Sequence, residues 1–211
     1  MHNSDKDLNV DIGFVGEILG DTGSLYLNAD YSITDNWIVS SAYNRFNNSA
    51  GDFFELGGGY YKRDGIYYGQ LLGSIGYGRG SHSWVQSSSS FIGPSIKTTE
   101  FVEASGTRFT LTPAIGLDFK YLSLAVSNRF SQLNYFDITD TSDGVPIAST
   151  DPNSLENYPN QFLIEPAITF RVKYKVIGLQ YQFIFPINLT NSEIPNSNLA
   201  ITAGLSIIID K

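Results

Sequence analysis

The sequence predicts an all-β fold, a single closed antiparallel up-and-down β-barrel of ten strands, with eight strands as the alternative. Two observations predict this fold. Apolar residues recur at every second position, the spacing of one strand face, along runs longer than the usual strand of about 5 or 6 residues. The connections between these runs also alternate between tight turns and longer loops, as they do in barrels that cross a membrane.

The strands are placed where this alternation is clear, for example in residues 25–33, 109–119 and 177–187. The ten predicted strands are residues 8–19, 24–33, 36–46, 52–63, 65–79, 106–119, 122–136, 160–173, 176–188 and 198–209. Residues 1–7 are predicted to be a disordered polar tail, and residues 8–211 the barrel domain.

The connections fall into two classes that alternate along the chain. Short turns are predicted at 34–35, 63–65, 120–121 and 174–175, and longer loops at 20–23, 47–51, 80–105, 137–159 and 189–197. Outer-membrane barrels have short periplasmic turns and long extracellular loops. The pattern therefore predicts an outer-membrane location with both termini periplasmic.

Composition excludes several classes of function. Charged residues make up only 16% of the chain and aromatic residues 14%, which disfavours a soluble helical bundle. The net charge of −8 argues against a nucleic-acid partner, which would require a basic face. The chain has no cysteine and therefore neither disulfides nor thiolate metal sites. No cofactor is expected.

The polar residues of the alternating strands predict which face is inside. Most are small or uncharged, and the charges have both signs, which suits a narrow lumen better than a solvated surface. We expect Glu55, Arg129, Glu165 and Arg171 to lie inside and to form one hydrogen-bonded ionic network. The alternative is a soluble ligand-binding barrel that carries these charges on its surface.

Aromatic residues gather near the predicted short turns. They are Trp37, Tyr60, Tyr61, Tyr67, Tyr68, Tyr121 and Tyr174. Aromatic side chains at both membrane interfaces are typical of membrane barrels, although aromatic residues also favour strands in general. We expect these residues to form an interface girdle.

Four segments carry a family resemblance. Tyr31-Ser-Ile-Thr-Asp-Asn-Trp37, Phe54-Glu-Leu-Gly-Gly-Gly-Tyr-Tyr61, Gly76-Tyr-Gly-Arg-Gly80 and Phe162-Leu-Ile-Glu-Pro-Ala-Ile168 resemble small outer-membrane β-barrel proteins of the Bacteroidetes. The resemblance implies an outer-membrane location and brings no catalytic residues with it. The chain ends in Ile209-Asp210-Lys211 and not in the terminal aromatic residue common in proteobacterial barrels.

The sequence offers few candidates for catalytic or metal-binding residues. The two histidines are His2, in the polar tail, and His82, which Ser81 and Ser83 flank. Sequence neighbours rarely reach the geometry that a catalytic Ser–His pair requires. The acidic segment 137–159 does not match a known calcium loop. We therefore expect no catalytic residues, no metal site and no enzymatic activity.

The predicted loop 80–105 carries apolar residues that are unusual in an extracellular loop. They include Phe91, Ile92, Ile96 and Phe101, which could form a folded cap, contact a partner protein or extend the two flanking strands beyond the membrane. The first functional hypothesis is an accessory, scaffold or binding subunit of an outer-membrane assembly, its lumen plugged by side chains. Its partners would be outer-membrane lipid and another outer-membrane or surface protein. The alternatives are a narrow passive pore and a soluble ligand-binding barrel.

Overall fold

The computed structural model describes residues 8–17, 23–46, 51–88, 96–142, 145–146, 159–190 and 199–209. Its long strands are β1 (Leu8–Glu17), β2 (Gly23–Ser32), β3 (Trp37–Phe46), β4 (Gly51–Asp64), β5 (Tyr67–Ser88), β6 (Ile96–Asp118), β7 (Leu122–Ser142), β9 (Asn160–Tyr174), β10 (Ile177–Ile184) and β12 (Ala200–Ile209). β8 (Val145–Pro146) and β11 (Ile187–Asn188) are two-residue segments. The predicted tail, residues 1–7, lies outside the described residues.

The long strands pair antiparallel around a complete circle. Their order runs from β9 through β10, β12 and β1 to β7, and β7 pairs with β9 again. The first strand pairs with the last, from Leu8 opposite Ile209 to Glu17 opposite Ala200. The predicted closed barrel of ten strands is confirmed, and the eight-stranded alternative is wrong. No helix in the described part of the chain is long and apolar enough to span a bilayer.

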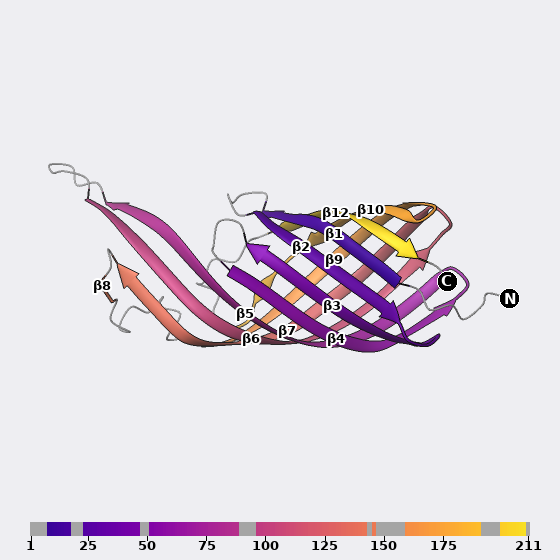
Figure 1. The fold of residues 1–211 in the computed structure, drawn as a ribbon, viewed down its shortest axis with the longest axis horizontal. Coiled ribbons are helices and arrows are strands. Elements are labelled where there is room, and N and C mark those ends of the chain that lie inside the picture. Colours follow the sequence, from indigo (N-terminus) through magenta and orange to yellow (C-terminus); the bar gives the residue numbers. More distant parts are fainter. Residues whose placement is uncertain are drawn as a thin grey trace.

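Tight turns gather at one end of the barrel, where β1 begins and β12 ends (Figure 1). They comprise residues 33–36, 65–66, 119–121 and 175–176. Two of them are two-residue hairpins in which the first residue has positive φ, 60° at Gly65 and 54° at Lys175. Such turns match the right-handed twist of the paired strands. We call this end the short-turn end.

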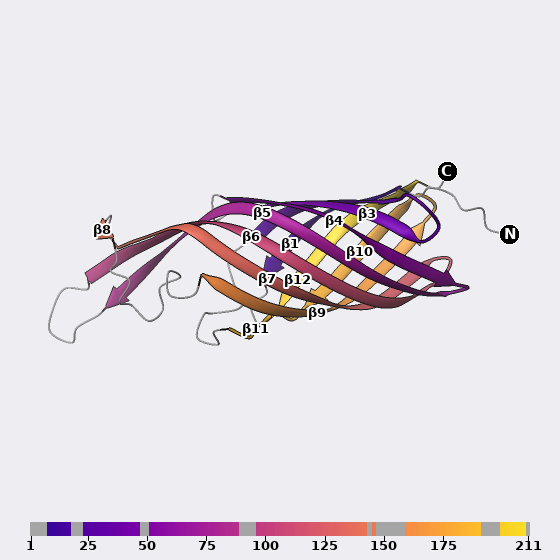
Figure 2. The same cartoon turned by 90° about the horizontal axis from the view of Figure 1, so that it is seen from below.

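At the opposite end, β5, β6 and β7 continue far beyond the other strands (Figures 1 and 2). β5 and β6 stay paired out to Ser88 opposite Ile96, and β7 follows β6 to Ser142. The predicted loop 80–105 is therefore mostly strand in its described part, and β7 continues to Ser142, past residue 137 where a loop was predicted to start. We call the part of β5–β7 that passes the barrel rim the projecting sheet.

Residues 80–105 were predicted to be a loop, with extension of the flanking strands only as one alternative, for a physical reason. Outside the wall of a barrel both faces of a strand can meet water, so its residues need not alternate between apolar and polar. The segment Ser81–Ser88 is rich in serine and lacks that alternation. Of the three roles considered for this region, the extension of the flanking strands is observed.

Two prolines coincide with interruptions of the hydrogen-bonded ladder. Pro113 lies in a gap of the β6–β7 pairing, between Leu111 opposite Phe130 and Ala114 opposite Ser127. Pro186 separates β10 from β11, so the predicted strand 176–188 is split. A proline has no N–H to donate, which explains both interruptions.

Candidate functional site

The barrel has its polar side chains inside and its apolar side chains outside. Among the described residues, the only buried apolar side chains are Ala114 and Ala167. The buried polar residues are Asp11, Ser32, Ser105, Thr110, Ser131, Gln161, Asn188, Thr202 and Ser206. The outer wall exposes large apolar residues, with Phe14 at 65% and Ile115 at 70%. This sidedness is the reverse of a soluble protein and matches a membrane barrel.

Strand β9 contributes to each of the three ion clusters in the lumen. Alternation along the strand places Glu165, Ala167, Thr169, Arg171 and Lys173 on its inner face. The three charged members together reach three other strands: Glu165 contacts β6 and β7, Arg171 contacts β1, and Lys173 contacts β6. One strand thus ties together side chains from several parts of the lumen.

The first group, which we call the Glu165 cluster, joins β6, β7 and β9. Glu165 forms an ion pair with Arg108, and its Oε2 lies 3.9 Å from an Nη1 of Arg129. Arg108 also donates to the Ser131 hydroxyl at 2.8 Å and 3.1 Å, and Ser131 donates to Glu165 at 3.2 Å. Ser131 is fully buried, and the Arg108 and Glu165 side chains are each 15% exposed. One carboxylate therefore balances two guanidinium groups in a confined space.

The second group, the Arg171 cluster, crosses from β9 to β1. Arg171 Nη2 lies 3.1 Å from Asp11 Oδ2, and Arg171 Nε donates to Gln180 at 2.9 Å. The side chain passes over Gly178, where an added Cβ would overlap the Ser206 hydroxyl and lie 3.4 Å from Arg171 Cγ. A larger residue is disfavoured here chiefly because its Cβ would overlap the Ser206 hydroxyl. The Arg171 guanidinium reaches Asp11 across two intervening strands, β10 and β12.

A third group, the Asp118 cluster, lies at the short-turn end. Asp118 closes β6 and forms ion pairs with Lys173 of β9 and, at 2.8 Å, with Arg63 of β4. Ser123 of β7 donates a further hydrogen bond to the same carboxylate. The cluster connects four strands across this mouth of the barrel.

The four charged residues chosen from sequence all lie on the inner face, but in three separate groups. Arg129 and Glu165 share the Glu165 cluster, and Arg171 belongs to the Arg171 cluster. Glu55 instead accepts hydrogen bonds from Ser74 and, at 3.1 Å, from Thr110. The expectation of one network across all four residues is not what the structure has.

Two important partners were not chosen from sequence. Arg108 is the most closely placed cation of Glu165, and Asp11 is the anion of Arg171. Both occupy inner positions of the same alternation that selected Glu165, so their face was predictable. Their pairing was not, because it depends on how distant strands are placed when the barrel closes.

Aromatic rings fill other parts of the lumen by lying over glycines. An added Cβ at Gly13 would lie 2.6 Å from a ring carbon of Tyr26, and one at Gly116 would lie 2.5 Å from Tyr68. At Gly76 it would lie 2.5 Å from Phe53. These contacts fit flat rings against bare backbone. Tyr68 therefore faces the lumen, and its predicted place in the outer girdle is wrong.

Tyr61 has the same parity along β4 as Glu55 and Arg63, so it belongs to the inner face and its predicted place in the outer girdle is also wrong. The five remaining aromatic residues near the short turns lie on the outer wall. Trp37 packs edge-on against Tyr60, with ring centroids 5.9 Å apart. Trp37, Tyr60, Tyr67, Tyr121 and Tyr174 are all exposed. An amphipathic ring at this position suits the boundary between hydrocarbon and water.

The described residues hold no cluster of three or more His, Cys, Asp or Glu side chains that could bind a metal ion. His82 lies in β5, with its backbone opposite Val102. Of the apolar residues proposed to contact a partner, Phe91 and Ile92 lie outside the described residues. The backbones of Ile96 and Phe101 belong to β6, opposite Ser88 and Ser83.

Comparison with known proteins identifies the fold. No family model matches the chain, and no curated protein matches it. The outer membrane protease OmpT from Escherichia coli is similar in structure, with a TM-score of 0.59 and 9% identity over 98% of this chain and 94% of that one. The translocator domain of the autotransporter NalP from Neisseria meningitidis has a TM-score of 0.53 and 11% identity, covering 99% and 88%.

These likenesses at low identity establish architecture and not activity. A closed barrel of ten antiparallel strands, with a polar lumen and an apolar wall, is the architecture of outer-membrane β-barrel proteins. The chain is such a barrel. Its apolar wall is the opposite of what the soluble ligand-binding alternative requires.

Proposed function

We propose that this protein is a non-catalytic outer-membrane barrel that acts as an accessory or binding subunit of a surface assembly. In this proposal the lumen is closed to solute flow, and the projecting sheet contacts a partner protein. The observation that carries the proposal is the contrast between a lumen crossed by ion clusters and three strands that extend well past the rim.

The contents of the lumen support closure. Ten strands enclose an interior that is only slightly wider than that of eight-stranded barrels, which side chains fill. The Glu165 and Arg171 clusters hold long guanidinium side chains across this space, where they are 15% and 22% exposed. Rings over glycines occupy further space. A filled lumen favours a structural or binding role over transport.

The projecting sheet supports partner binding. β5 and β6 remain paired for nine further residue pairs beyond Arg79, which is the last β5 residue that β4 contacts. Near the rim, an ion pair between Arg79 and Glu103 joins β5 to β6. A ring contact between Tyr77 and Phe136 joins β5 to β7. Ordered strands keep a contact surface in one shape, which lowers the entropy cost of binding.

The proposed orientation places the short-turn end in the periplasm and the projecting sheet outside the cell. It follows from the rule that periplasmic turns of such barrels are short and extracellular connections long. Both chain ends would then be periplasmic, since β1 begins and β12 ends at the short-turn end. Protease treatment of intact cells should cleave the projecting sheet and spare the turn at 65–66.

A shortened variant tests the partner proposal. Residues 82–102 are replaced by Asn-Gly, which joins Ser81 to the residue opposite it, Glu103, through a two-residue hairpin turn. Both forms are expressed in outer membranes, cross-linked and purified. We expect a stoichiometric companion with the full chain and none with the shortened barrel.

The control for this experiment is Glu103→Gln in the full chain, which removes the exposed ion pair but keeps the projecting strands. It should retain the companion. A heat-dependent gel shift verifies that every variant is a folded barrel. An identical set of companions for the full and shortened chains would contradict the proposal.

A further inference from the structure

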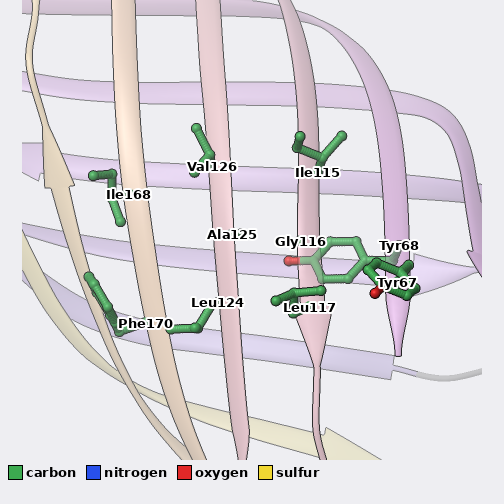
Figure 3. A pocket seen from close by; sticks show the side chains of 10 residues that line it. All are labelled: Tyr67, Tyr68, Ile115, Gly116, Leu117, Leu124, Ala125, Val126, Ile168 and Phe170. Atoms are coloured by element: carbon green, nitrogen blue, oxygen red, sulfur yellow. The ribbon is translucent and has the colours of Figure 1, made fainter. Parts of the chain in front are cut away.

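An apolar groove is hollowed into the outer wall near the short-turn end. Its volume is about 610 Å³, within the range of small-molecule sites. Figure 3 shows the side chains that line it, from β5, β6, β7 and β9. They are Tyr67, Tyr68, Ile115, Leu117, Leu124, Val126, Ile168 and Phe170, with Gly116 and Ala125 between them.

The floor of the groove is backbone at two inward-facing positions, Gly116 and Ala125, which lie opposite each other in the β6–β7 ladder. Tyr68 is also inward-facing, and its ring lies over Gly116 on the lumen side. Outer side chains such as Ile115 and Val126 stand around this low point, exposed at 70% and 56%.

Two lysines held by tyrosine rings lie in turns at the short-turn end, which follow groove-lining strands along the chain. Lys120 and Tyr121 form the turn that follows Leu117, and the Lys120 ammonium lies 5.0 Å from the Tyr121 ring centre. Lys175 lies in the same way 5.5 Å from the Tyr174 ring. Contact with a ring restrains a lysine that would otherwise move freely.

The two cation-bearing turns are neighbours. The amide of Lys173 donates to the carbonyl of Tyr121 at 2.9 Å, which fixes the β9–β10 turn beside the β6–β7 turn. Neither turn contains an acidic residue, and the nearby Asp118 is engaged in its own cluster with Lys173 and Arg63. Positive charge at this rim is therefore available to a ligand.

We propose that this groove binds one anionic phospholipid, with an acyl chain against β6, β7 and β9 and its phosphate at Lys120 and Lys175. The inference rests on the membrane placement proposed above, in which the short-turn end faces the periplasmic leaflet. Basic pockets beside membrane-spanning segments recognise anionic head groups, and the groove supplies the adjoining apolar surface. A flat protein contact would use the apolar wall but would leave the two lysines unmatched.

Native mass spectrometry of the full chain in detergent provides the test. Phosphatidylglycerol or phosphatidylcholine is added, and lipid-bound protein is counted. We expect one phosphatidylglycerol per barrel, bound more tightly than phosphatidylcholine. Lys120→Gln and Lys175→Gln should each weaken phosphatidylglycerol binding about fivefold and leave phosphatidylcholine unchanged. Lys62→Gln, at the same end but outside the groove, should change neither.

A bulky substitution in the groove distinguishes lipid binding in the groove from lipid binding elsewhere on the outer wall. Val126→Trp should weaken the binding of both lipids about tenfold, whereas Val39→Trp, on the outer face of β3, should not. Equal effects of the two substitutions would overturn the groove as the site. Loss of a dimer signal in Val126→Trp, with lipid binding intact, would show that a second copy occupies the groove and would also overturn the proposal.

The lipid result is independent of the partner result. A barrel that loses its companion on removal of residues 82–102 but binds both lipids equally contradicts the lipid site alone. A barrel that binds phosphatidylglycerol as expected but keeps its companion after that deletion contradicts the accessory role alone.

Discussion

The Glu165 and Arg171 clusters solve the same problem in different ways. Each holds a guanidinium in a narrow lumen. In the first, Glu165 interacts with two arginines from adjacent strands. In the second, Arg171 passes over Gly178 and interacts with one carboxylate and one amide. The Glu165 cluster depends on the balance of charges among three side chains. The Arg171 cluster depends on a side chain long enough to span two intervening strands. Their common member, β9, shows how one strand can cross-link much of a lumen.

This difference has consequences for stability. In the Glu165 cluster, loss of the carboxylate leaves two cations facing each other, because both Arg108 and Arg129 depend on it. In the Arg171 cluster, loss of the charge on Asp11 leaves one cation that keeps its bond to Gln180. The Glu165 cluster should therefore be the more sensitive to substitution.

The largest effect is expected from Glu165→Gln. Removing one partner of a buried ion pair costs about 3–5 kcal/mol, and the two remaining arginines repel each other. Equilibrium unfolding in guanidinium, with the barrel in lipid vesicles, measures the loss. Combining Glu165→Gln with Arg108→Met should recover part of it, since the pair of cations is then reduced to one. A Glu165→Gln barrel as stable as the natural chain would show that the cluster does not hold the lumen together.

A smaller effect is expected from Asp11→Asn. The amide oxygen can still accept from Arg171, so the change removes charge and keeps the contact, at a cost of about 1–2 kcal/mol. The same unfolding assay compares it with Glu165→Gln. An Asp11→Asn barrel that loses more stability than Glu165→Gln would reverse the proposed order of the two clusters.

Gly178→Ala tests whether the Arg171 cluster requires a glycine at position 178. The new methyl group would overlap the Ser206 hydroxyl, and overpacking of this kind costs about 1–3 kcal/mol. Ser206→Gly in the same chain should restore most of the stability, because it removes the overlapping atom. Rescue is measured as the coupling in a double-mutant cycle. Additive losses would mean that Gly178 is needed for another reason.

The smallest effect is expected outside the lumen. Glu103→Gln breaks the ion pair with Arg79, whose side chains are 32% and 68% exposed. Such a pair contributes about 0–1 kcal/mol and is screened by salt. Unfolding at low and high ionic strength should show a difference that shrinks with added salt. A loss as large as that of Glu165→Gln would contradict the distinction between lumen and surface.

The sequence predicted the barrel because alternation is imposed at every position of the wall. Ile115 and Asp118 differ in parity, and the lipid side and lumen side follow from that alone. It did not predict the pairing of Arg171 with Asp11, which lies 160 positions earlier. That contact requires the closed sheet. The projecting strands were only one of the alternatives predicted for residues 80–105, because the segment Ser81–Ser88 carries no alternation to detect.

Conductance across a planar lipid bilayer tests the closed lumen most directly. The natural chain, inserted as a folded barrel, should show no steady channels. Arg108→Ala combined with Arg129→Ala and Glu165→Ala removes all three charged side chains of the Glu165 cluster and should open a measurable current. Steady open channels from the natural chain would contradict the closed lumen and would favour the narrow pore.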